Sequence, residues 1–238
     1  MQWDLCWQSG NADALLGIAV MEEVAVGPSP PWLIGRLAGP ISWRVGAEDW
    51  DTAVREMLRI GGFKPTGRNR PAHEFLARAS GGVPSISNLV DANNAVSLTY
   101  RLPASVIEGK VLAGALMIRE GCPGERYVFN RSGQELDLEG LLVVCSASGV
   151  PVASPVKDAL TAHVTEGTAQ IAFCAYGSRV LLTAADMNAV LDDFVELARS
   201  VAGGRCVARW VASRDAVECN QGSDSGGLST KSPGGPSR

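Results

Sequence analysis

The side chains best suited to chemistry stand in a short polar run, Asn88 to Leu98, which otherwise has the pattern of a helix. Asn93 and Asn94 lie inside it, although asparagine is a mediocre helix former because its side chain competes for nearby backbone groups. An amide both donates and accepts hydrogen bonds, so two neighbouring amides can hold a polar ligand. The alternative is that they bond backbone groups at a helix junction, which is the role we expect for Asp91.

The sequence does not indicate chemistry that depends on a catalytic triad or a metal. Its two histidines, His73 and His163, are accompanied by no nucleophile elbow. The six cysteines are scattered with no Cys-x-x-Cys pair, whereas a structural zinc site needs about four converging ligands. We therefore predict neither a metal nor a cofactor, and we expect reduced thiols, several of them in the core.

A basic stretch lies between Arg55 and Arg78 and includes Lys64, Arg68 and Arg70, although the whole chain has a net charge of −4. The net acidity argues against indiscriminate nucleic-acid binding, but the distribution of charge matters more than the total. Two readings stay open at this point. The stretch is either an ordinary solvated face or an edge that contacts phosphate groups.

Hydrophobic periodicity indicates a mixed α/β chain with its clearest helix near the end. Thr183 and Asp186 resemble a capping pair before an apolar stripe, and Gly203-Gly204 follows that stripe. Expected helices cover Glu48 to Ile60, Pro71 to Ala79, Ser85 or Ser87 to Thr99, and Ala184 to Val201. Expected strands or extended segments cover Ala14 to Val26, Trp32 to Ile41, Val111 to Arg119, Arg126 to Asn130, Gly140 to Ser146, Val150 to Ala153, Ala169 to Tyr176 and Arg205 to Val211.

This order of elements requires no more than one compact domain. We place it at residues 1–212, with a core at 48–210, followed by a tail at 213–238. From Gln221 onward the chain has no large apolar side chain, so we expect the tail to be disordered. The longest apolar runs are too short to span a bilayer, and the N-terminus does not resemble a signal peptide. We expect a cytoplasmic protein.

Four segments in order resemble the B3/B4 tRNA-editing domain, a family found within the phenylalanyl-tRNA synthetase beta subunit and as free-standing proteins. The most specific is Asn88 to Leu98, which Leu102-Pro103 follows. The others are Lys64 to Arg78, then Gly114 to Arg119 with Gly124-Glu125, and finally Lys157-Asp158 with Val164 to Cys174. Together they cover about half of the chain. The resemblance implies a B3/B4-like fold, with a central mixed sheet flanked by helices.

The resemblance also implies an activity, the hydrolysis of the ester that joins a wrong amino acid to the tRNA 3′ end. Such an ester is already activated, so a site needs a positioned water, donors for the developing oxyanion and a selective pocket. The implied partner is the tRNA acceptor end, contacted by Lys64, Arg68 and Arg70. No membrane or DNA partner is implied.

Particular residues inherit roles from this resemblance. Asn93 and Asn94 fall where the synthetase family has a Thr-Asn pair that lines the editing pocket, so they would hold the terminal ribose or the substrate ammonium. Asp158 lies close to the position where the synthetase family has an acidic editing residue, and it would orient water or bind the amino group, unless it is a surface turn residue. Arg119 and Glu125 either pair with one another or bind substrate, and Thr165 and Thr168 either bond locally or touch substrate.

One departure from the family pattern concerns the mechanism. The family has His-Ala-Phe-Asp just after the proline, where this chain has Ser105-Val106-Ile107-Glu108. The missing histidine removes one water-positioning group, and His163 is the candidate to replace it.

The reading that the sequence favours is therefore a trans-acting aminoacyl-tRNA deacylase. Asp158 and His163 are the expected catalytic residues, and Asn93, Asn94, Arg119, Glu125 and Thr165 are expected to bind substrate. Two alternatives stay open: a non-catalytic module that binds tRNA or an amino acid, and a hydrolase of another small ester or amide.

Overall fold

The centre of the molecule is a five-stranded antiparallel sheet in the order β11-β10-β2-β9-β3. A computed structural model describes residues 2–39, 47–79 and 82–219. The central strands β2, Ala14–Glu22, and β9, Gln170–Ser178, are buried along nearly their whole length. β10, Arg205–Ser213, and β11, Ala216–Cys219, continue the sheet on one side, and β3, Ala104–Glu108, forms the opposite edge.

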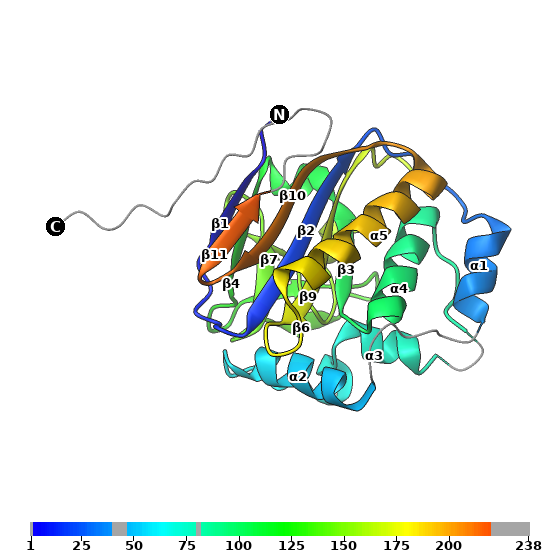
Figure 1. Ribbon diagram of the computed structural model, residues 1–238. Coiled ribbons are helices and arrows are strands. Elements are labelled where there is room, and N and C mark those ends of the chain that lie inside the picture. The colour runs from blue at the N-terminus through cyan, green and yellow to red at the C-terminus, as the bar shows by residue number, and fades with distance from the viewer. Residues whose placement is uncertain (1, 40–46, 80–81, 220–238) are drawn as a thin grey trace.

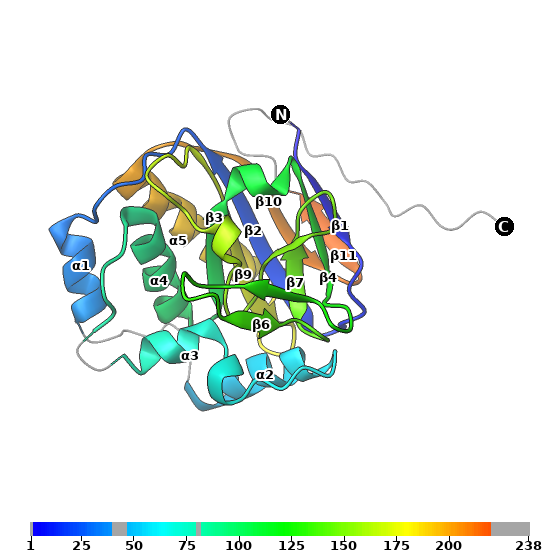
Figure 2. The same cartoon turned by 180° about the vertical axis from the view of Figure 1, so that it is seen from behind.

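A second, smaller sheet packs behind the first in the order β1-β4-β7-β8 (Figures 1 and 2). Its strands are β1, Asp4–Trp7; β4, Ala115–Glu120; β7, Leu142–Cys145; and β8, Pro151–Ala153. β1 runs parallel to β4 and the other pairs are antiparallel, so this sheet is mixed. A separate hairpin joins β5, Arg126–Val128, to β6, Glu135–Asp137.

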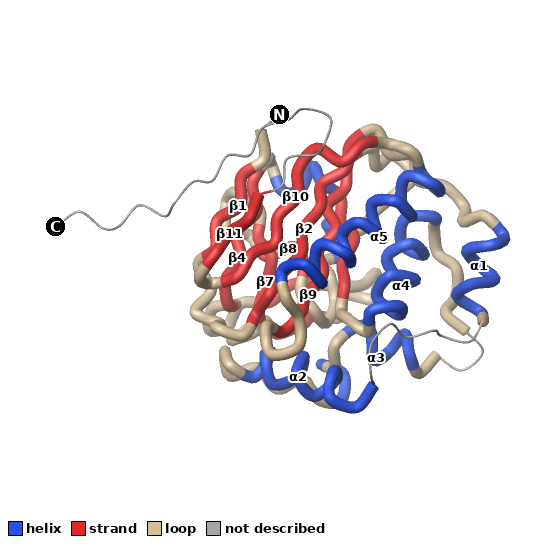
Figure 3. The backbone as a smooth tube through the Cα atoms, in the orientation of Figure 1, coloured by secondary structure: helices blue, strands red, loops and turns tan. Residues whose placement is uncertain are grey.

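Two helices cover the other face of the five-stranded sheet (Figures 1 and 3). α5, Ala184–Ala202, begins at the expected capping box of Thr183 and Asp186, and α4, Asn88–Tyr100, packs beside it. The ring of Phe194 on α5 stacks on Phe173 of β9 with centroids 3.8 Å apart, and such aromatic contacts bury a large apolar area. The fold is thus a mixed α/β arrangement of helices, an antiparallel sheet and a mixed sheet, as the sequence indicated.

Two further helices close one end of the molecule. α2, Ala47–Arg59, and α3, Ala72–Ala77, lie below the sheets in Figure 2, and both were predicted. Short 3₁₀ turns are η1, Gly67–Asn69; η2, Gly109–Leu112; and η3, Leu160–Ala162.

The prediction of an extended segment at Trp32 to Ile41 was wrong. Pro31–Ala38 is the helix α1. Pro31 occupies the first helical turn, where its missing N–H costs nothing. Leu33 and Leu37, four residues apart, are buried in a cluster with Ala95 and Leu98 of α4. This spacing carried the helical signal, which the preceding prolines obscured.

The expected strand at Val111 to Arg119 is shorter than predicted. η2 takes up its first residues, and Ala113 and Gly114 both adopt positive φ angles, 55° and 85°, before β4 begins. At the other end of the chain, β10 extends to Ser213 and β11 follows, so ordered structure continues past residue 212. The predicted tail from Gln221 lies outside the described residues. No helix in the described ranges is long and apolar enough to cross a membrane.

Candidate functional site

Three of the residues singled out from the sequence meet along β3, the edge strand of the larger sheet. The side chain of Asn93 on α4 donates a 3.4 Å hydrogen bond to the backbone carbonyl of Ala104, the first residue of β3. The carboxylate of Asp158 accepts a 2.7 Å hydrogen bond from Ser105, the next residue. The exposed His163 forms an antiparallel bridge with Ile107. Segments far apart in the sequence therefore converge on five residues of one strand.

The amide pair lies at the buried side of this arrangement. Asn93 and Asn94 are 6% and 7% exposed, and Asn93 Nδ2 also donates to Asn94 Oδ1 over 3.4 Å. Asn93 Oδ1 is buried without a hydrogen-bond partner. A buried polar atom left unpaired is costly, so Asn93 Oδ1 is an acceptor whose hydrogen bond the described residues do not supply.

Asp91, by contrast, has the structural role that the sequence predicted. Its carboxylate accepts hydrogen bonds from the hydroxyls of Ser29 and Ser85 and from the backbone N–H of Ile86. These contacts fix the chain that leads into α4.

Asp158 is a half-buried carboxyl group with an asymmetric environment. Its Oδ1 accepts hydrogen bonds from Ser105 Oγ at 2.7 Å and from the backbone N–H of Ser154 at 3.3 Å. Its Oδ2 has no hydrogen-bond partner among the residues that the structure describes. Burial raises the pKa of Asp158 to about 7, although both hydrogen bonds oppose this shift. Near neutral pH the group can thus both accept and release a proton.

A set of hydroxyl groups surrounds this carboxylate, and the sequence did not reveal it. The Ser105 hydroxyl lies 3.3 Å from the buried hydroxyl of Tyr176 on β9. The hydroxyl of Tyr127 donates to Ser154 Oγ at 3.0 Å, and Ser154 Oγ in turn donates to the Lys157 carbonyl at 2.8 Å. Burial raises the pKa of both tyrosines, so both remain neutral donors. Only the unusual serine in place of the family histidine gave a sequence signal here.

Basic side chains lie beside the Asp158 loop. The ammonium of Lys157 donates a 3.2 Å hydrogen bond to the backbone carbonyl of Arg68 and sits 4.1 Å from the centre of the Phe129 ring. Burial and the neighbouring Arg68 charge lower the pKa of Lys157. Arg131 is close enough to His163 to help lower the pKa of that ring, although desolvation contributes more. Arg68, Lys157 and Arg131 together are called the basic rim below.

Of the predicted tRNA-binding residues, Arg68 is part of this rim, and Lys64 and Arg70 lie near it in the sequence. The backbone N–H of Ala72 donates to the carbonyl of Pro155, which ties the basic stretch to the Asp158 loop. Lys64 and Arg68 are exposed and Arg70 is half-buried.

Other predicted residues are engaged in local contacts. Arg119 and Glu125 form a two-point ion pair, with nitrogen–oxygen distances of 2.7 and 2.8 Å, and Arg119 also bonds the Gly149 carbonyl. Thr168 Oγ1 accepts from the backbone N–H of the exposed Thr165 and donates to Glu108. These are the structural alternatives that we considered for all four residues.

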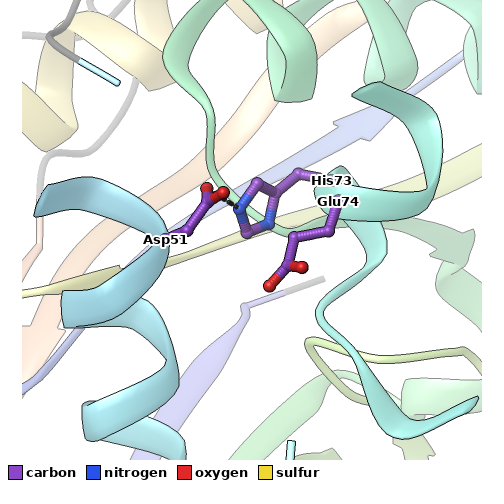
Figure 4. A group of neighbouring side chains, drawn as sticks. All are labelled: Asp51, His73 and Glu74. Atoms are coloured by element: carbon purple, nitrogen blue, oxygen red, sulfur yellow. Dashed lines mark hydrogen bonds and ion pairs between the residues drawn. The ribbon is translucent and has the colours of Figure 1, made fainter. Parts of the chain in front are cut away.

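A separate charged cluster joins α2 and α3 (Figure 4). Potential ligand atoms of Asp51, His73 and Glu74 lie within 4.8 Å of one another. However, Arg101 contacts both oxygens of Asp51 at 2.7 Å, and Arg55 contacts both oxygens of Glu74. Despite the opposing effect of burial, the hydrogen bonds from Arg101 and His73 lower the pKa of Asp51. With two arginines already neutralising both carboxylates, the cluster is better suited to an ion-pair network than to a metal.

A cavity of about 270 Å³ lies on another part of the surface, between α1, α4 and α5. Its lining residues are Arg36, Val96, Thr99, Asp193, Glu196, Leu197 and Ser200. None of the residues predicted to act on substrate lines this cavity.

A comparison with protein families identifies the family of this chain. The chain matches the B3/4 domain family over residues 64–190 and belongs to that family. The matched range includes α4, β3, the Asp158 loop and His163, together with the basic stretch from Lys64.

The structure is also similar to the crystal structure of an N-terminal fragment of the phenylalanyl-tRNA synthetase beta subunit from Pyrococcus horikoshii. The TM-score is 0.52 at 9% sequence identity, with 92% of this chain and 55% of that chain covered. At this identity the likeness concerns the fold, and the chain spans just over half of the fragment's length. No curated protein has a significant match to the sequence.

Proposed function

We propose that this B3/4 protein is a trans-acting aminoacyl-tRNA deacylase, which hydrolyses the ester joining an amino acid to the 3′ end of tRNA. The observation that carries the proposal is the meeting of Asn93, Asp158 and His163 along β3, beside the basic rim. The B3/4 family match and the fold of a phenylalanyl-tRNA synthetase fragment support a connection to tRNA.

Asp158 is suited to the proton transfer of ester hydrolysis. Its unpartnered Oδ2 accepts a proton from water as the water oxygen attacks the ester carbonyl. When the tetrahedral intermediate collapses, that proton passes to the departing ribose oxygen, and the free amino acid is released. A general base is most effective when its pKa is close to the working pH, and the pKa of Asp158 is about 7.

Asn93 on α4 and His163 after η3 supply further polar groups, which contact β3 at Ala104 and Ile107. The unpaired Asn93 Oδ1 is an acceptor for the substrate ammonium or a ribose hydroxyl. His163 has a lowered pKa, which keeps its ring neutral at pH 7 and able to share the proton transfer. Asn94, which bonds Asn93, fixes the amide in place.

The basic rim accounts for a substrate that carries phosphate groups. Arg68 is exposed, and Lys157 is held against its carbonyl, so two cationic groups lie within reach of one phosphate beside Asp158. Lys64 and Arg70 extend the positive charge along the same stretch. On a protein with a net negative charge, a local basic rim favours binding of an anionic partner at this one surface and not elsewhere. We also infer that the enzyme works in the cytoplasm, on the acceptor end of tRNA.

The test is deacylation of a panel of tRNAs, each charged with a wrong amino acid, by the wild-type chain and by Asp158→Asn. The expected result is release of at least one amino acid above the buffer rate, with loss of this activity in Asp158→Asn. Turnover of none of the substrates would overturn the proposal.

One observation favours a second candidate, a module that binds tRNA without turnover. The family histidine is replaced by Ser105, so a water-positioning group is missing from its usual place. This candidate predicts steeply salt-dependent tRNA binding with no release of amino acid. A third candidate, motivated by the net charge of −4, hydrolyses free aminoacyl esters and has no affinity for tRNA. Replacing Arg68 and Arg70 together separates it from the first two.

A further inference from the structure

Ser105 occupies the position where the resemblance to the editing domains places a histidine, and it is the residue that holds Asp158. It is 1% exposed, and its hydroxyl oxygen lies 2.7 Å from Asp158 Oδ1. The strand direction explains the contact. Ser105 pairs with Cys174 of β9 and therefore points to the same face of the sheet as Cys174 and Tyr176.

The hydroxyls of Tyr176 and Ser105 and the carboxylate of Asp158 form a short chain of hydrogen bonds, in which each donor points toward the carboxylate. An ionised Asp158 accepts only, so Ser105 must donate to it. The Ser105 oxygen is then free to accept from the Tyr176 hydroxyl, 3.3 Å away. Such chains of donors strengthen one another in a buried setting. Asp158 Oδ1 is therefore occupied by hydrogen bonds within the protein.

The same contacts leave the other carboxylate oxygen for the reaction. Ser105 and the Ser154 N–H both bond Oδ1, and no residue in the described part of the chain bonds Oδ2. Ser105 itself is too deeply buried to touch a substrate. We propose that Ser105, backed by Tyr176, is a positioning residue that fixes Asp158 so that Oδ2 faces the ester and its attacking water. The inference rests on the deacylase function proposed above.

Other titratable groups face Asp158 and must be taken into account in a test. They lie on β5, on β9 and just after η3: Tyr127, Cys174, Tyr176 and His163. The ammonium of Lys157, the preceding residue, contacts the Arg68 carbonyl and the Phe129 ring instead. Burial raises the pKa of Tyr127, Cys174 and Tyr176, so these three stay neutral near pH 7. Between pH 6 and 9 the titration of Asp158 is thus affected chiefly by His163 and by the loss of the Ser105 bond.

The experiment compares Ser105→Ala with Ser105→Thr, which keeps the hydroxyl. The control is Ser97→Ala, which removes a buried serine that bonds the Leu102 carbonyl instead of a carboxylate. The first readout is the pH profile of kcat/KM for deacylation. The second is the pKa of the Asp158 carboxyl group, followed by the NMR chemical shift of its carboxyl carbon.

The expected result for Ser105→Ala is a midpoint raised by about one pH unit in both readouts, because a donor to the charged form has been removed. At pH 7 this alone lowers kcat/KM about fivefold. Ser105→Thr restores the wild-type midpoint, and Ser97→Ala leaves it unchanged. A Ser105→Ala profile with the wild-type midpoint in both readouts would overturn the proposal, even if the rate were lower.

The two proposals fail in different ways. If the wild-type chain turns over no mischarged tRNA while the Ser105→Ala carboxyl midpoint still shifts, the deacylase function is rejected and the hold of Ser105 on Asp158 is supported. If turnover occurs and neither midpoint moves, the deacylase function stands and the positioning role is rejected.

Discussion

The Lys157 ammonium donates a 3.2 Å hydrogen bond to the backbone carbonyl of Arg68, a residue 89 positions earlier in the chain. This contact fixes the exposed basic stretch beside the loop that carries Asp158. The proposed binding edge for phosphate and the proposed proton acceptor are thereby joined through Arg68 and Lys157. The experiments below examine each part of this arrangement.

Replacement of Asp158 by asparagine is expected to remove deacylation and to stabilise the fold at alkaline pH. The folded-state pKa of about 7 lies above the ordinary value of 3.8, so the folded protein binds more protons between about pH 4 and 7. The wild-type chain therefore loses stability as the pH rises through this window, and the neutral amide does not. The free energy of unfolding of Asp158→Asn should exceed that of the wild type by about 1–3 kcal/mol at pH 8. Below pH 4 the two should be equal.

Urea unfolding at both pH values measures this difference. Equal stability of the two proteins at pH 8 would mean that Asp158 is not a desolvated carboxylate.

Removal of the charge of Arg68 is expected to weaken tRNA binding in a salt-dependent manner. Each phosphate contact contributes about 0.7–0.9 to the slope of log affinity against log salt concentration. Arg68→Gln should therefore reduce this slope by about one, with little change in the rate on a small aminoacyl ester. Arg214→Gln is a matched control, since Arg214 is exposed and contacts Asp215 at the turn between β10 and β11.

Filter binding or fluorescence anisotropy at several salt concentrations gives the slopes. A slope for Arg68→Gln equal to that of the wild type, or a similar loss in Arg214→Gln, would contradict a phosphate contact at Arg68.

Truncation of Asn93 to alanine is expected to raise KM for aminoacyl-tRNA more than it lowers kcat. The side chain offers a buried, unpaired acceptor, and a neutral hydrogen bond to substrate stabilises the complex by about 0.5–1.5 kcal/mol. The corresponding rise in KM is about two- to tenfold. Single-turnover and steady-state kinetics separate the two parameters, and an unchanged KM would place Asn93 outside the substrate pocket.

The network around Asp51 is expected to stabilise the fold above about pH 4. Its hydrogen bonds lower the pKa of Asp51 below the ordinary value, so its contribution is present above that value and is lost as the pH falls. Asp51→Ala leaves the buried His73 and the half-buried Arg101 without this partner and should cost about 2–4 kcal/mol at pH 7. Glu135→Gln, which removes the exposed pair with Arg126, should cost under about 1 kcal/mol.

Thermal unfolding with and without added zinc distinguishes this network from a metal site. A marked rise in Tm with zinc in the wild type, lost in Asp51→Ala, would show that these residues bind metal.

The helices with strong local signals were predictable from the sequence. α5 has an apolar stripe behind a capping box, and α2 ends at Arg59, shortly before the expected stop at Gly61-Gly62. β3 was missed because it spans only five residues directly after Pro103, and its burial depends on β9, which pairs with it from far along the chain. Strands of this kind are defined by tertiary pairing, which local patterns do not record.

The residues of the candidate site could be proposed from the sequence, but the contacts between them could not. Asn93 and Asp158 were identified by their resemblance to family positions, and His163 was identified as the candidate to replace the missing histidine. Nothing in the spacing showed that Ser105 would contact Asp158 or that Tyr176 would stand behind Ser105, because strand register decides both contacts. The pairing of Arg119 with Glu125 was one of two alternatives, and only coordinates could choose between them.

The position of β3 at the edge of its sheet also bears on the tendency of the protein to aggregate. A strand with one unpaired side is a template on which another chain can add, and natural proteins cover such sides. Here the covering groups are Asn93, which occupies the Ala104 carbonyl, and His163, which bridges to Ile107. Residues of the proposed site therefore also cover part of this edge. The His163 bridge is made by the backbone and survives a change of its side chain, whereas truncation of Asn93 uncovers the Ala104 carbonyl.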